Sequence, residues 1–142
     1  MVKRYLPHFV LITLGTIILD QVTKYYVRAR QPDLTWGVLQ IHGSSNPGAA
    51  FSILQEYGSV LAVISLLVAL AVIFFYYKIP QNKMPQLFWG LFLGGVVGNL
   101  IDRVFMSAVT DFIDFSFWPS FNIADATITI STIVLVVYYW EK

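Results

Sequence analysis

The chain has 142 residues, of which 57% are hydrophobic and only 12% are charged, and this composition argues against a soluble domain, which carries about 25% charged residues. The net charge of +1 offers no basis for nucleic-acid binding. The absence of cysteine excludes disulfides and a thiolate nucleophile, and the two histidines, His8 and His42, form no zinc-binding pattern, so we expect no metal site.

The first predicted membrane span covers residues 6–27. It imitates a secretory signal peptide, but "DQVTKYYVRAR" (20–30) follows the apolar run where a cleavage site of small residues would be needed, so we predict an uncleaved span. Asp20 and Lys24 lie four residues apart near its end and therefore share a face. They form either a surface ion pair or, if they lie below the membrane interface, a pair that faces the bundle interior.

Residues 28–57 are too polar to span a membrane and too long for a simple turn. Partial alternation in "LTWGVLQIHG" (34–43) predicts a short strand or two at the surface. In "NPGAAFS" (46–52), Asn46 offers an amide donor and acceptor, and Gly48 allows a close backbone approach. A simple Asn-Pro-Gly turn is the alternative interpretation of this motif.

The second predicted span, residues 58–77, has no charge over twenty residues and is long enough to cross about 30 Å of hydrocarbon. A short, basic, proline-containing turn leads to the third span, residues 86–106. Gly90, Gly94 and Gly98 recur there every four residues and so share one face. This pattern predicts close packing against another helix, or alternatively against a second copy of the chain.

The third span ends in "GNLIDR" (98–103), where Asn99 and Arg103 share a face. Such polar side chains in a span usually point into a bundle or a wet cavity. Alternatively, Arg103 extends to the lipid head groups with Asp102 as its partner.

The fourth predicted span covers residues 122–140. Asn122 is a good N-cap and Asp125 stands three residues later, so a capping box could explain Asp125, but it leaves Asp111 in the preceding loop unexplained. We therefore predict that Asp111 and Asp125 act together. Two close carboxylates share a proton near neutral pH, so one can activate water while the other protonates a leaving nitrogen.

The predicted spans place seven of the eight acidic residues on one side of the membrane. This clustering indicates a site at that interface. A small proton-coupled transporter or channel, the main alternative, predicts acids throughout the membrane depth. A Ser–Lys peptidase using Ser45 or Ser52 with Lys24 is disfavoured because Asp20 would keep the lysine protonated. An assembly factor that binds through its glycine face would leave the aspartate pair unexplained.

Five motifs carry a family resemblance along nearly the whole chain. "DQVTK", "NPGAAFS", "GGVVGNLIDR", "VTDFIDF" and "FNIADA" occur in the order and span positions of the lipoprotein signal peptidases, also called signal peptidase II, and the chain resembles that family. The resemblance implies a single membrane-embedded domain over residues 1–142. Its expected fold is an all-α four-transmembrane-helix bundle with a small extracytoplasmic, partly β segment at about residues 28–57.

The resemblance also implies an activity. Members of the family are aspartyl endopeptidases that remove signal peptides from diacylglyceryl-modified prolipoproteins, cutting before the lipidated cysteine without a cofactor. Their catalytic pair falls here on Asp111 and Asp125. The other motif residues, which shape the site and contact substrate or the antibiotic globomycin, fall on Asn46, Asn99, Arg103, Asn122, Asp20 and Lys24.

The resemblance further implies a multi-pass protein of the bacterial cytoplasmic (inner) membrane. Both termini are expected in the cytoplasm with the active site facing outwards, the surrounding lipid is an expected partner, and we expect a monomer. Three positions need comment: Ser107 stands where a glycine is expected, residues 28–45 look shorter than usual, and Asp114 is assigned a structural role.

Overall fold

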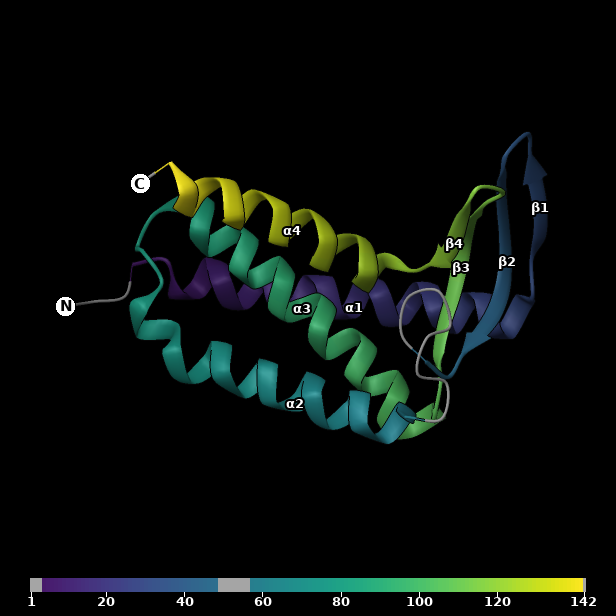
Figure 1. Ribbon diagram of the computed structural model, residues 1–142, viewed down its shortest axis with the longest axis horizontal. Coiled ribbons are helices and arrows are strands. Elements are labelled where there is room, and N and C mark those ends of the chain that lie inside the picture. The colour runs from purple at the N-terminus through teal and green to yellow at the C-terminus, as the bar shows by residue number, and fades with distance from the viewer. Residues whose placement is uncertain (1–3, 49–56, 142) are drawn as a thin grey trace.

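The computed structural model describes residues 4–48 and 57–141. Within these ranges four helices lie side by side, and a small sheet packs across one end of them (Figure 1). The helices are α1 (Leu6–Arg30), α2 (Gly58–Phe74, continued by the 3-10 turn η3, Phe75–Lys78), α3 (Lys83–Met106) and α4 (Ile123–Trp140). All four are long and apolar enough to cross a membrane. They confirm the predicted fold of four candidate transmembrane helices.

The outer surface of the bundle is apolar. On α2, for example, the side chains of Leu67 and Phe74 are 60% and 72% exposed. Large exposed apolar surfaces are rare on soluble proteins and mark contact with lipid or a partner. The outward-facing side chains of the helices therefore suit contact with lipid and not with water.

The centre of the bundle is α3, because its glycines let two other helices approach closely. A methyl group added to Gly94 would lie 2.5 Å from Cβ of Thr16 on α1, and Gly90 and Gly98 also face α1. A methyl group on Gly95 would lie 2.6 Å from the α4 backbone. The predicted helix-packing face is confirmed, and because α1 occupies it, the alternative of a second copy at this face is wrong.

The sheet is antiparallel with strand order β1-β2-β3-β4. Its strands are β1 (Asp33–Trp36), β2 (Leu39–Asn46), β3 (Val109–Phe115) and β4 (Trp118–Phe121). The sequence predicts strands only around residues 34–43, and it places Asp111 in a loop and Asn46 in a long connection, whereas both lie on strands. Aspartate is a poor strand former and "VTDFIDF" has apolar residues on both faces, so the pattern of β3 is obscured.

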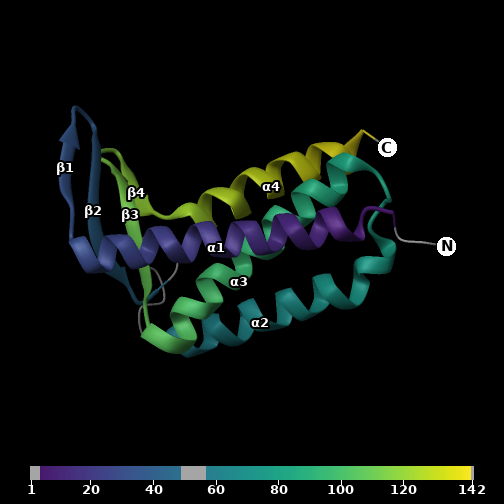
Figure 2. The ribbon, with the colours of Figure 1, turned by 180° about the vertical axis from the view of Figure 1, so that it is seen from behind.

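The sheet gathers the chain at one end of the bundle. β1 and β2 follow α1, and the β3–β4 hairpin connects α3 to α4, while the start of α1 and the end of α4 lie at the opposite end, as the reverse view in Figure 2 also shows. Three helices and the sheet thus converge where the predicted polar residues lie.

Candidate active site

Asp111 on β3 and Asp125 in the first turn of α4 line one cavity of about 440 Å³. Asn46 and Arg103 line the same cavity, which lies between the β3–β4 hairpin and the first half of α4. The remaining walls are mostly apolar and include Val109, Trp118, Phe121, Ile128 and Ile130. A polar end and an apolar wall therefore share one cavity beside a membrane-spanning helix.

Two amide groups hold the carboxylate of Asp111. Nδ2 of Asn46 donates to Oδ2 at 2.9 Å, and Nδ2 of Asn122 donates to Oδ1 at 2.8 Å. The side chain is only 2% exposed, and this burial raises the pKa of Asp111 to about 6. The charge of Asp125 raises the pKa further, while the two amides and the charge of Lys24 oppose the shift.

Asp125 serves both as part of a helix cap and as part of the cavity. Its Oδ2 accepts from the backbone N–H of Asn122 at 3.2 Å, and Oδ1 of Asn122 accepts from the backbone N–H of Asp125 at 2.9 Å. The predicted capping box is confirmed. Because the cap uses Oδ2, Oδ1 is available to Asn99, whose Nδ2 donates to it at 2.8 Å. Capping and a role in the site are compatible and not alternatives.

Lys24 fixes the orientation of the Asn99 amide. Oδ1 of Asn99 accepts from Lys24 Nζ at 2.9 Å and from Asn122 Nδ2 at 3.2 Å, so its NH2 group is directed to Asp125. Lys24 Nζ also lies 2.8 Å from Asp20 Oδ2, and both of these side chains are fully buried. The surface ion pair is therefore wrong, and the pair faces the bundle interior.

Arg103 reaches the cavity from the last turn of α3. Its Nη2 donates to the carbonyl of Gly48 at 3.4 Å, and its buried Nε has no hydrogen-bond partner among the described residues. Asp102 lies instead 3.3 Å from Lys24 Nζ. The interpretation that Arg103 extends to head groups with Asp102 as its partner is thus not what the structure shows.

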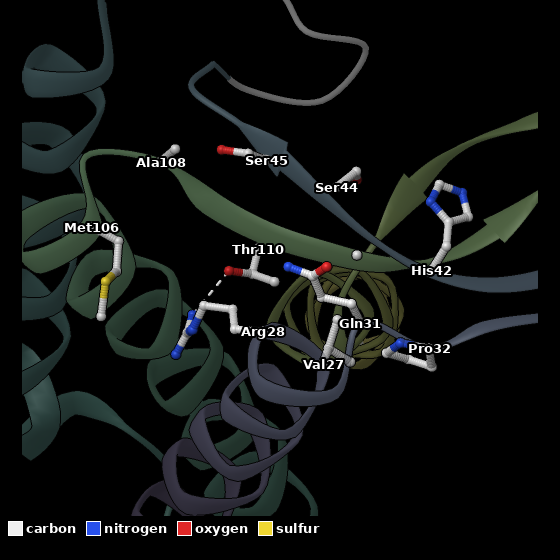
Figure 3. Close-up of a pocket in the computed structure, with 11 residues that line it drawn as sticks. Val27, Arg28, Gln31, Pro32, His42, Ser44, Ser45, Met106, Ala108 and Thr110 are labelled. Carbon is white, nitrogen blue, oxygen red and sulfur yellow. Dashed lines mark hydrogen bonds between the residues drawn. The ribbon is translucent and has the colours of Figure 1, made fainter.

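A second cavity, of about 520 Å³, lies at the end of α1 and is lined by none of the predicted site residues (Figure 3). Thr110 and Ser45, which pair across β3 and β2, line it, and Arg28 Nη1 donates to Thr110 Oγ1 at 2.9 Å. Thr110 adjoins Asp111 on the strand, and successive side chains point to opposite faces. The two cavities therefore lie on opposite sides of β3.

Two further predictions have structural outcomes. Asp114 Oδ2 lies 3.0 Å from His42 Nε2 on the neighbouring strand, which agrees with the structural role assigned to Asp114. The Ser–Lys alternative has no support: Ser45 lines the second cavity, which the buried Lys24 does not line, and Ser52 lies outside the described residues.

Sequence reasoning placed Asp102 on the same side of the membrane as the site but gave it no role there beyond a partner for Arg103, and it did not single out Gln21. Asp102 is 1% exposed and accepts from the backbone N–H of Thr110 at 3.0 Å, and Gln21 Nε2 donates to Asp102 Oδ1 at 3.2 Å. The spacing of Asp20, Lys24 and Arg28, every four residues along one helix face, could have indicated a charged stripe that needs an acidic partner.

The geometry favours proton-transfer chemistry. Two carboxylates line one cavity, the pKa of Asp111 is raised to about 6, and amide donors hold both groups in place. Such a pair can hold one proton, take another from water and return one to a leaving group.

Comparisons with known proteins agree on one family. The family model described as "Signal peptidase (SPase) II" matches residues 12–141. The lipoprotein signal peptidase of Halothermothrix orenii is 34% identical over 93% of this chain and 94% of its own length. That of a Synechocystis species is 39% identical over 92% of this chain and 86% of its own length.

Solved structures give the same result at the level of the fold. A structure described as a bacterial membrane enzyme, determined by the in meso method at 2.3 Å resolution, superposes with a TM-score of 0.89 at 31% identity. The match covers 96% of this chain and 90% of that chain.

Proposed function

The chain belongs to the signal peptidase II family, and we propose that it is an aspartic endopeptidase whose catalytic pair is Asp111 and Asp125. As a member of this family it is a protease, a multi-pass bacterial membrane protein, and an enzyme that removes signal peptides from prolipoproteins. The proton-coupled transporter has no comparable support. The observation that carries the catalytic assignment is that both aspartates line the same cavity.

In the proposed mechanism the two aspartates bracket a water molecule next to the scissile peptide. One carboxylate removes a proton from the water as it attacks the carbonyl carbon, and the other, protonated, donates to the departing nitrogen. The pair titrates as a unit, so the proton belongs to both residues.

Six further side chains take part in the proposal, and three of them orient the pair. Asn46, Asn99 and Asn122 orient the carboxylates through the amide bonds described above. Arg103 lines the cavity and has a buried donor without a described partner, so it is suited to hold a substrate carbonyl. Asp20 and Lys24 lie behind Asn99 and support it.

The apolar wall of the cavity suits a lipid-carrying substrate. Ile128 and Ile130 continue from Asp125 along α4, which is long and apolar enough to span the bilayer. We propose that the diacylglyceryl chains on the substrate's cysteine lie in the bilayer along this wall, and that cleavage occurs just before that cysteine. Globomycin is proposed to occupy the same cavity.

We propose that the sheet end of the bundle faces outwards from the cytoplasmic (inner) membrane, with both termini in the cytoplasm. Lys78 and Lys83 lie around the connection at the opposite end, where positive residues favour the cytoplasm. The whole chain is proposed to act as one domain and as a monomer, since α1 and not a second copy occupies the glycine face of α3.

The test is cleavage of a diacylglyceryl-modified prolipoprotein in reconstituted liposomes, followed by gel shift. Asp111→Asn and Asp125→Asn are expected to fold, to retain globomycin binding and to lose cleavage. Asp114→Asn, the same change on the same strand but outside the cavity, is the matched control and is expected to cleave normally. Normal turnover by Asp111→Asn would refute the proposal, and proton flux in these liposomes would favour the transporter.

A further inference from the structure

Each proposed catalytic aspartate directly follows a residue whose backbone N–H is bound by a buried carboxylate. The N–H of Thr110, before Asp111, donates to Asp102 Oδ2 at 3.0 Å. The N–H of Ala124, before Asp125, donates to Asp20 Oδ1 at 2.9 Å. Asp102 and Asp20 are 1% and 0% exposed. A second pair of carboxylates, one on α3 and one on α1, thus lies behind the first pair.

Two donors from α1 join this second pair. Lys24 Nζ lies 2.8 Å from Asp20 Oδ2 and 3.3 Å from Asp102 Oδ2. Gln21 Nε2 lies within hydrogen-bond distance of Asp20 Oδ2 at 3.1 Å, Asp102 Oδ1 at 3.2 Å and the carbonyl of Gly98 at 3.0 Å, so its two N–H groups are shared among three acceptors. Each donor therefore contacts both carboxylates and fixes the spacing between them.

We propose that Asp20 and Asp102, joined by Lys24 and Gln21, are positioning residues that set the separation of Asp111 and Asp125. The inference rests on the proposed function. Asp111 lies on a strand and Asp125 on a helix, with the β3–β4 hairpin between them. The joined carboxylates connect the backbone beside each aspartate to the tightly packed helices α1 and α3, which are stiffer supports than a hairpin.

The charge balance of the cluster agrees with a positional role. Lys24 and Arg28 offset Asp20 and Asp102, and Arg28 Nη1 lies 3.5 Å from Asp102 Oδ1 while it donates to Thr110 (Figure 3). Buried ion pairs are weak contributors to stability, since apolar residues of similar volume often serve as well or better. A role in positioning the aspartate pair explains why charged side chains are buried at this place.

The decisive variant is Gln21→Met, because it removes a joining donor, keeps a side chain of similar size and changes no charge. It is expected to lower kcat at least about tenfold, because small misplacements of reacting groups are costly. It is also expected to move at least one limb of the pH–rate profile, whose limbs report the aspartate pair as a unit, by at least about half a unit. The charged groups that face the aspartate pair, Lys24 and Asp20 from α1 and Arg103 and Asp102 from α3, are all retained. Gln81→Met, the same substitution at the opposite end of the bundle, is the control.

A purely structural role would give a different result. Fewer folded molecules would lower the rate by the same factor at every pH and leave the shape of the profile unchanged, and that outcome would overturn the inference. Asp20→Asn and Asp102→Asn supply a second measurement: because one joined unit is broken by either change, the double variant is expected to lose little more than the worse single variant. If the activity loss of the double variant equals the product of the two single losses, the proposal is contradicted.

The catalytic assignment and the positioning role can be refuted separately. If Asp111→Asn still cleaves, the proposed function is wrong. If Asp111→Asn is inactive while Gln21→Met matches the wild type in kcat and in pH profile, only the positioning role is wrong.

Discussion

Asn122 and Asp125 hydrogen-bond each other in both directions at the start of α4. Asn122 also donates a hydrogen bond to Asp111. Its Oδ1 accepts from the Asp125 N–H at 2.9 Å, its own N–H donates to Asp125 Oδ2 at 3.2 Å, and its Nδ2 donates to Asp111 Oδ1 at 2.8 Å. One side chain therefore joins the cap of a membrane span to the proposed catalytic pair.

Because Asn122 both caps α4 and binds Asp111, substitutions there are predicted to affect stability and activity to different extents. Asn122→Ser keeps a capping oxygen but is too short to reach Asp111, whereas Asn122→Ala also loses the cap, which is worth about 1 kcal/mol. Both variants are expected to lose cleavage at least about tenfold, as when a positioned hydrogen bond is removed. In thermal unfolding in detergent, Asn122→Ser should have a higher unfolding temperature than Asn122→Ala. Wild-type turnover by Asn122→Ser would show that the bond to Asp111 is dispensable.

Stability is predicted to depend on pH through Asp111. Burial raises the pKa of this carboxyl from 3.8 to about 6, so the folded protein binds its proton more tightly than the unfolded chain does. The contribution to folding is complete below pH 3.8 and is lost as the pH rises through about 6, a change of about 3 kcal/mol. Asp111→Asn lacks this titration.

The measurement is the unfolding free energy of both proteins in detergent at pH 4 and at pH 7. The advantage of the wild type over Asp111→Asn in unfolding free energy should fall by about 2 kcal/mol between pH 4 and pH 7, because pH 4 lies too close to the unfolded pKa of 3.8 to capture the whole change. Asp33→Asn is the control, since Asp33 is exposed on β1 and lies outside the cavity. A difference that stays constant with pH would contradict the raised pKa.

The sequence predicts the helices well and the sheet poorly. Long apolar runs such as residues 58–77 identify membrane spans because few other structures use them. Strand β3 contains two aspartates and apolar residues on both faces, so local pattern does not reveal it. What makes it a strand is pairing with β2, whose Asn46 stands opposite Val109, sixty-three positions later in the chain.

In the candidate site, too, some contacts could be predicted from the sequence and others depend on the fold. Asp20 and Lys24, four residues apart, could be predicted to touch, but only the fold decides that the pair is buried. The contact of Asp102 with the N–H of Thr110 involves a backbone group, which no residue pattern identifies. The amide bonds among Asn99, Asn122 and the aspartates depend on the meeting of α3, α4 and β3.

Two glycines are predicted to respond differently to an added methyl group, because only Gly94 lies in the close contact between α1 and α3. A methyl group on Gly94 would lie 2.5 Å from Thr16 Cβ and 2.9 Å from the carbonyl of Thr13, so Gly94→Ala should cost about 1–3 kcal/mol. Gly15→Ala on α1 meets nothing within 4 Å and should be neutral or stabilising by up to about 1 kcal/mol. Thermal unfolding of the two variants checks this. Equal effects would argue against close contact at Gly94.

The turn between α3 and β3 predicts a stabilising substitution. Ser107 ends α3 with φ of 60°, a left-handed conformation that costs a non-glycine residue about 1–2 kcal/mol. The glycine that the family resemblance leads one to expect here would relieve this strain. Ser107→Gly should therefore raise the unfolding free energy by about 0.5–1 kcal/mol, because greater freedom of the unfolded chain offsets part of the gain.

Two further substitutions at the same position make this prediction specific to the backbone. Ser107→Ala leaves the strain in place and should be close to neutral, whereas Ser107→Val puts a β-branched side chain at positive φ and should be the least stable of the series. Chemical or thermal unfolding in one detergent gives the order glycine, serine or alanine, then valine. If valine were tolerated as well as glycine, the left-handed turn would not be what limits stability between α3 and the strand that carries Asp111.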